Sequence, residues 1–148
     1  MLARPRRPHR LTLAGLLILA AALWNGLRLV EAILFWKTLA EYHLRAGPAY
    51  VALSGGFWLA AGLVLFAALW TGRKWSGSAA IAAVCAYATW FWFDRLVLQV
   101  PHANMPFVLA TSLLILIVIL AALASSRTRR FLRQKEEYER QSKSQAPA

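Results

Sequence analysis

Long apolar stretches, separated by short polar ones, organise this chain. The apolar stretches run over residues 11–36, 49–71, 78–99 and 106–124. A helix of about 20 residues, rising 1.5 Å per residue, crosses the hydrocarbon core of a bilayer. The short connections between the stretches contain Gly, Pro or Asn, residues that commonly end helices. The pattern therefore predicts four membrane-spanning helices.

The predicted fold class is an all-α membrane protein in which residues 11–124 form one four-helix transmembrane bundle. Residues 1–10 form a basic N-terminal tail, and residues 125–148 form a basic C-terminal extension, expected to continue as a helix and to end in disorder. Hydrophobic residues make up 59% of the chain. That fraction is too high for a soluble domain of this size and favours the membrane class.

Positive charge is concentrated at the two ends of the chain. A net charge of +11 would suggest nucleic acid as the partner of a soluble protein, but here the basic residues flank the first and last spans. The positive-inside rule then places both termini on the cytoplasmic side of the cell inner membrane, and we expect no nucleic-acid partner. The residues expected to contact anionic lipid headgroups at that face are Arg127, Arg129, Arg130 and Arg133.

The N-terminal region allows a second interpretation. The Arg-rich residues 1–10 are followed by an apolar segment and by Ala20, Ala21 and Ala22, which is typical of a cleavable signal peptide. The apolar stretch, however, continues well past any such cleavage site. We therefore favour an uncleaved first span.

Two charged pairs interrupt the first and third spans. Counted from Leu11, Arg28 lies about 25 Å across a core of about 30 Å and Glu31 lies at its outer boundary. Asp94 and Arg95 reach the same depth on the third span. Because opposite charges at one depth can neutralise each other, we predict that Arg28 pairs with Asp94. Glu31 is expected to pair with Arg95, or with Arg28 one turn away.

Further polar and aromatic side chains gather at this depth. The predicted polar cluster, structural or ligand-binding, comprises Asn25, Arg28, Glu31, Asp94, Arg95 and His102. Trp24, Tyr87, Trp90 and Trp92 could line an apolar pocket beneath it, suited to an amphipathic ligand. The alternative is an aromatic belt at the membrane interface.

Small residues in the second span indicate a close helix contact. Gly56 and Ala60 are four residues apart, a spacing that lets two helices approach each other. We expect this face to pack within the bundle, and dimerisation through the same face is the alternative.

The sequence contains no pattern that announces catalysis. Cys85 is the only cysteine, which excludes the CxxC pair that four-helix thiol–quinone oxidoreductases need. Small multidrug-resistance transporters are similar in size and have an acid in their first helix, but their carboxylate lies nearer mid-membrane and their loop charges are nearly balanced. The histidines have no metal-ligand spacing. We therefore identify no family and expect neither a metal nor a cofactor.

The leading functional hypothesis is a non-enzymatic structural or accessory membrane protein whose polar cluster fixes helix packing. Its expected partners are the lipid bilayer and either a second copy of itself or another membrane protein. The alternative is binding or transport of a small amphipathic or ionic ligand at the cluster. An enzyme would require a bound cofactor that the sequence does not indicate.

Overall fold

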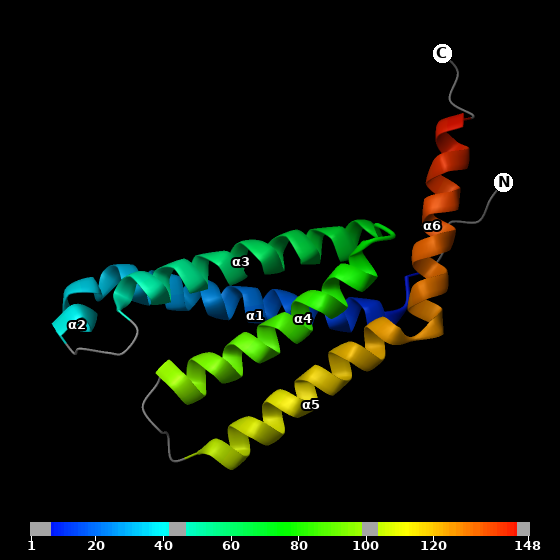
Figure 1. Ribbon diagram of the computed structural model, residues 1–148. Helices are drawn as coiled ribbons and strands as arrows, with labels where there is room; N and C mark the ends of the chain where they lie inside the picture. The colour runs from blue at the N-terminus through cyan, green and yellow to red at the C-terminus, as the bar shows by residue number, and fades with distance from the viewer. Residues whose placement is uncertain (1–6, 42–46, 99–103, 145–148) are drawn as a thin grey trace.

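The computed structural model describes residues 7–41, 47–98 and 104–144, and these ranges contain helices and no strand (Figure 1). In chain order the elements are α1 (His9–Leu34), α2 (Trp36–Glu41), α3 (Pro48–Thr71), α4 (Ser76–Phe93), the π-helical turn η1 (Asp94–Leu98), α5 (Met105–Ala124) and α6 (Ser126–Ser144). Four helices, α1, α3, α4 continued by η1, and α5, are long and apolar enough to cross a membrane. The predicted all-helical class and its four span-length helices are confirmed.

Helix boundaries follow local chemistry. Proline occupies the first turn of α3 and of α5, where its missing N–H breaks no helical hydrogen bond. Gly72 ends α3 in the left-handed conformation, at φ 70°, and the Arg73 amide then bonds back to the Ala68 carbonyl. The first helix ends at Leu34, two residues before the predicted end of its span. Phe35 leaves helical geometry there, and α2 turns off the axis of α1 (Figure 1).

The α1 and α3 helices pack along most of their length. Their close contact depends on Gly55 and Gly62: a Cβ atom at Gly62 would lie 2.6 Å from Ala22 Cβ, and one at Gly55 would lie 2.9 Å from the Asn25 carbonyl oxygen. The prediction that Gly56 and Ala60 form the close contact is wrong, because Ala60 is exposed. The contacting face is turned by one residue from the predicted one.

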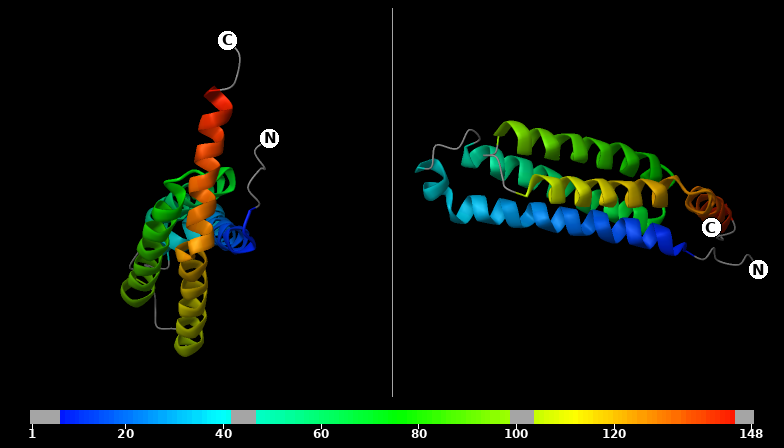
Figure 2. Two further views of the ribbon diagram at one scale, coloured as in Figure 1. Left: turned by 90° about the vertical axis from the view of Figure 1, so that its right-hand side faces the viewer. Right: turned by 90° about the horizontal axis from the view of Figure 1, so that it is seen from below.

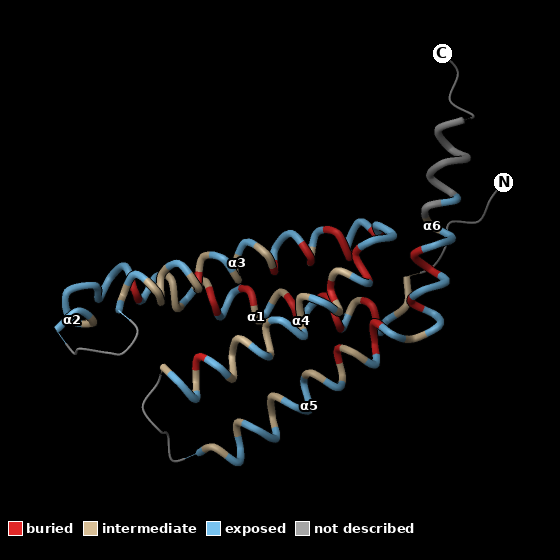
Figure 3. Tube along the Cα trace, in the orientation of Figure 1, coloured by how far each residue is buried: buried red, intermediate tan, exposed pale blue. Residues whose placement is uncertain are grey.

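Most of the apolar core lies at one end of the molecule, where α1 and α4 begin and α3 and α5 end. Figure 3 shows buried residues concentrated there. The core residues from these helices include Leu11, Leu65, Leu69, Ala80 and Leu123. The backbones of α1 and α4 have no extensive close approach, so long side chains such as Arg28 connect the two helices.

The C-terminal helix is separate from α5. Ser125 adopts an extended conformation, with ψ 139°, and the Thr128 hydroxyl donates to the Ala122 carbonyl across the break at 2.9 Å. As a result α6 crosses the end of the other helices (Figures 1 and 2). The predicted helix is therefore present, but it does not continue α5. Its face with Thr128, Phe131 and Leu132 is buried.

Lys135 of α6 contacts the end of α3, and we expect this contact to stabilise α6 against local unfolding. Its ammonium donates to the Thr71 carbonyl, one of the acceptors that a helix C-terminus leaves free. Lys135→Met should therefore lower the local opening free energy of α6 by roughly 1 kcal/mol. Hydrogen exchange of the α6 amides measures this loss. Arg133, which is exposed, provides the control. If the α6 amides exchange equally fast in Lys135→Met and Arg133→Met, the Lys135–Thr71 contact is not the cause of the faster exchange.

Candidate functional site

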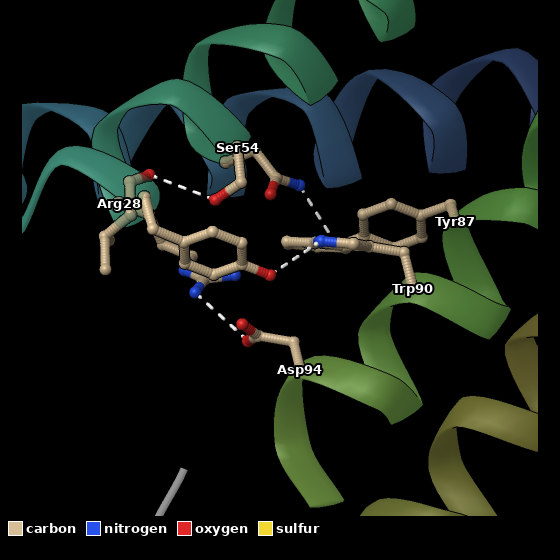
Figure 4. Close-up of polar contacts among 8 residues, drawn as sticks. Arg28, Ser54, Tyr87, Trp90 and Asp94 are labelled. Carbon is tan, nitrogen blue, oxygen red and sulfur yellow. Dashed lines mark hydrogen bonds and ion pairs between the residues drawn. The ribbon is translucent and has the colours of Figure 1, made fainter. Parts of the chain in front are cut away.

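An ion pair connects α1 with the end of α4. The Arg28 Nη2 donates to Asp94 Oδ2 at 3.2 Å, as the matching depths predicted (Figure 4). The side chains are 20% and 3% exposed, respectively. A carboxylate this deeply covered is stable as an anion only with cations or donors beside it, so the pair is a strong constraint on where α4 lies.

The π-helical turn places Asp94 at this position. The α4 helix ends at Phe93 and η1 starts at Asp94, so the backbone inserts an extra residue into the turn there. Such turns are rare in regular helices and occur often at functional sites. Asp94 is the buried residue of η1, while the neighbouring Arg95 is partly exposed.

Aromatic side chains surround the ion pair and contribute hydrogen bonds. The Arg28 guanidinium lies 5.3 Å from the centroid of the Trp90 ring, a cation–π geometry. The Trp90 indole N–H donates to the Tyr50 hydroxyl of α3 at 3.0 Å. Ser54 of α3, labelled in Figure 4, donates its hydroxyl hydrogen to the Val51 carbonyl of its own helix. The site therefore joins α1, α3 and α4.

Asn25 forms a second polar contact one turn before Arg28. Asn25 is 1% exposed. Its Nδ2 donates to the Ala21 carbonyl at 2.8 Å and to the Tyr87 hydroxyl at 3.0 Å. Its Oδ1 is buried and has no hydrogen-bond partner within the described part of the chain. A buried acceptor without a donor is uncommon and costs free energy.

The four aromatic residues that were predicted to line one pocket do not all lie together. Tyr87 and Trp90 lie together and pack on Trp58 of α3, with ring centroids 5.0 and 5.6 Å away. Trp92 packs edge-on against Phe91, whereas Trp24 is 62% exposed and stands outside this group. Trp58 and Tyr50, both on α3, were not predicted as part of the site, because neither charge nor depth marked that helix as a partner.

Glu31 and Arg95 were predicted to belong to the polar cluster, and neither forms an ion pair with Arg28 or Asp94. Glu31 is exposed, and neither predicted ion pair of Glu31, with Arg95 or with Arg28, is formed. The Arg95 Nε is buried without a hydrogen-bond partner among the described residues. His102 lies outside the described residues. The residues predicted to contact headgroups are all exposed, on the α6 face opposite its buried one: Arg127, Arg129, Arg130 and Arg133.

In the described ranges, no three side chains of His, Cys, Asp or Glu come together as metal ligands would. Arg28, Asp94 and their aromatic neighbours can hold a charge away from water, and Asn25 offers one spare acceptor. The chain matches no protein-family model, no curated protein and no solved structure.

Removing the Tyr87 hydroxyl tests the second polar contact. Tyr87→Phe keeps the ring packing on Trp58 and removes the acceptor of the Asn25 amide, which keeps its bond to Ala21. We expect the free energy of unfolding to fall by about 1 kcal/mol, the usual net value of one hydrogen bond. Thermal unfolding in detergent measures it. An unchanged melting temperature would show that the Asn25–Tyr87 bond contributes nothing.

Proposed function

We propose that the chain is a small, non-enzymatic integral membrane protein that acts as a structural or accessory component, with its four long helices forming a bundle. The observation that supports this role is the nearly complete burial of Asp94 against Arg28. The two charges neutralise each other, and the Arg28 guanidinium also lies over the Trp90 ring, whose N–H is hydrogen-bonded to Tyr50 of α3. An arrangement of this kind fixes the position of α4 better than it serves a reacting substrate.

The charge distribution supports an orientation with both termini on the cytoplasmic side of an inner membrane. The start of α1 and the whole of α6 lie at the same end of the molecule (Figure 1). Four spans, an even number, return the chain to the side of the membrane on which it started. Since both ends of the chain are rich in basic residues, the positive-inside rule assigns that side to the cytoplasm. The exposed arginines of α6 are then available to anionic headgroups.

Ligand binding at the same cluster is the second candidate function. The buried Asn25 Oδ1, which has no donor among the described residues, favours it. A small amphipathic or ionic ligand with one hydrogen-bond donor would satisfy this atom, and the aromatic rings of Tyr87 and Trp90 would contact its apolar part.

Native mass spectrometry of the full chain, extracted gently from its own membrane, tests the proposal. The accessory role predicts a second subunit in fixed stoichiometry, either another protein or a further copy of this chain. Recovery of a monomer carrying one small molecule, lost in Arg28→Ala and retained in the exposed-site control Glu31→Gln, would instead establish the ligand-binding function. A monomer with neither would contradict both.

A further inference from the structure

A second arginine, far from the ion pair, lies on an aromatic surface at the other end of α1. The Arg7 guanidinium carbon is 4.1 Å from the centroid of the Trp70 ring of α3. Arg7 Nη2 lies 3.9 Å from the place that a Cβ atom on Gly15 would take, and Phe66 lies 3.7 Å from the same place. The Phe66 and Trp70 rings are themselves 5.4 Å apart. Arg7 therefore extends along α1 to the level of Gly15, with its guanidinium over the Trp70 ring of α3.

The charge of Arg7 is not neutralised by the described residues. Its Nε and Nη2 are buried and make no hydrogen bond there, and no described carboxylate pairs with it. Burial also lowers the pKa of Arg7, because the charged form loses hydration. The Trp70 ring replaces only part of that hydration through its cation–π interaction. Arg7 as a whole is only partly buried, so the protein does not fully enclose its side chain.

We propose that Arg7 and Trp70 form a binding site for the phosphate group of an anionic phospholipid. A guanidinium is well suited to phosphate, since it is always charged and donates several hydrogen bonds in one plane. Trp70 precedes the last residue of α3, and tryptophan at the end of a span prefers the headgroup level. Trp70 is 53% exposed, which leaves surface for the first carbons of an acyl chain. Arg10, which is exposed, keeps the surroundings positive.

Lipid titration followed by native mass spectrometry tests this site in the delipidated full chain. Wild type should hold one phosphatidylglycerol more tightly than phosphatidylcholine. Arg7→Gln should bind phosphatidylglycerol about tenfold more weakly, since it loses a charge-assisted hydrogen bond. Arg73→Gln is the matched control: it removes an exposed cation from the same end and should change the affinity by less than about twofold.

Two further variants make the test independent of folding defects. Arg7→Lys keeps the charge without the planar group, and Trp70→Phe keeps an aromatic ring with a weaker cation–π interaction. Both variants should retain the fold and lower the affinity for phosphatidylglycerol by roughly threefold. Equal binding by wild type and all Arg7 and Trp70 variants would overturn the proposal. So would equal losses in Arg7→Gln and Arg73→Gln, because that result would indicate general charge attraction.

Titration with inorganic phosphate distinguishes a lipid headgroup from a free anion as the ligand of this site. Titrated alone, and in competition with phosphatidylglycerol, it should bind much more weakly than the lipid, because it makes no contact with the exposed Trp70 ring. Comparable affinity of inorganic phosphate for the wild type, lost in Arg7→Gln, would assign the site to a free anion and overturn its assignment to lipid.

Discussion

Asp94→Ala is expected to lower the free energy of unfolding by about 3 kcal/mol or more, the usual cost of removing one partner from a buried ion pair. Arg28 is only 20% exposed and would lose its carboxylate while keeping its charge. Arg28→Ala should be similarly harmful, because Asp94 is 3% exposed. Unfolding of the purified protein in mixed detergent micelles measures both effects.

The double variant distinguishes pairing from two independent effects. If Arg28 and Asp94 stabilise the protein through each other, Arg28→Ala with Asp94→Ala should be less harmful than the sum of the single variants by about 2 kcal/mol. Strict additivity would show that the contact has no energetic value. Glu31→Ala is the matched control on α1: Glu31 is exposed and unpaired with Arg28, so its effect should stay within about 0.5 kcal/mol.

Replacing both members of the ion pair by apolar residues tests whether the charges only stabilise the fold or also bind a ligand. Arg28→Met with Asp94→Leu fills similar volumes without charge, and such exchanges are often neutral. If the cluster only fixes the position of α4, this double variant should remain folded and keep its stoichiometric subunit. Loss of a bound molecule from a variant that stays folded would assign the charges to ligand binding instead.

Hydropathy and depth predicted much of this structure. The lengths of the four spans follow from the thickness of the bilayer, and the Arg28–Asp94 pair follows from equal depth on two helices that run in the same direction. Both inferences need only distances along single helices. They do not depend on how the helices are rotated.

Rotation is where sequence analysis failed. On α1, Asn25 is buried as a member of the polar cluster, but Trp24 and Glu31, which were predicted to lie in the pocket and the cluster, are exposed, whereas Ala22 and Ala32 are buried. In lipid, apolar side chains are as well accommodated outside the bundle as inside, so hydrophobicity does not identify the inner face. The small residues of α1 were the better signal.

The break at Ser125 was equally hard to foresee. The sequence there contains neither glycine nor proline, and the pairs of opposite charge beyond it favour a helix without saying where it starts. Hydrogen bonds among Ser125, Thr128 and the Ala122 carbonyl stabilise the turn. Serine and threonine are common at such positions because their hydroxyls replace backbone partners.

The second large effect is expected at the α1–α3 contact. Gly62→Ala places a methyl group 2.6 Å from Ala22 Cβ, a separation that real side chains do not reach. The two helices must then move apart along a contact on which most of their packing depends, and we expect a loss of about 1–3 kcal/mol. Gly55→Ala should be at least as harmful, because it meets the Asn25 carbonyl oxygen, a backbone atom that cannot rotate away.

Moving the methyl group across the interface isolates the cause. Ala22→Gly alone removes a buried methyl group, but in combination with Gly62→Ala it makes room for the new one, so the double variant should recover much of the lost stability. Gly56→Ala is the matched control, since its new Cβ would meet only Leu29 Cδ2 at 3.8 Å, an ordinary contact. If Gly56→Ala is as destabilising as Gly62→Ala, the loss reflects any added methyl group on α3. If instead only the Gly55 and Gly62 variants are harmful, and the exchange with Ala22 rescues the latter, close approach of α1 and α3 is what these two glycines provide.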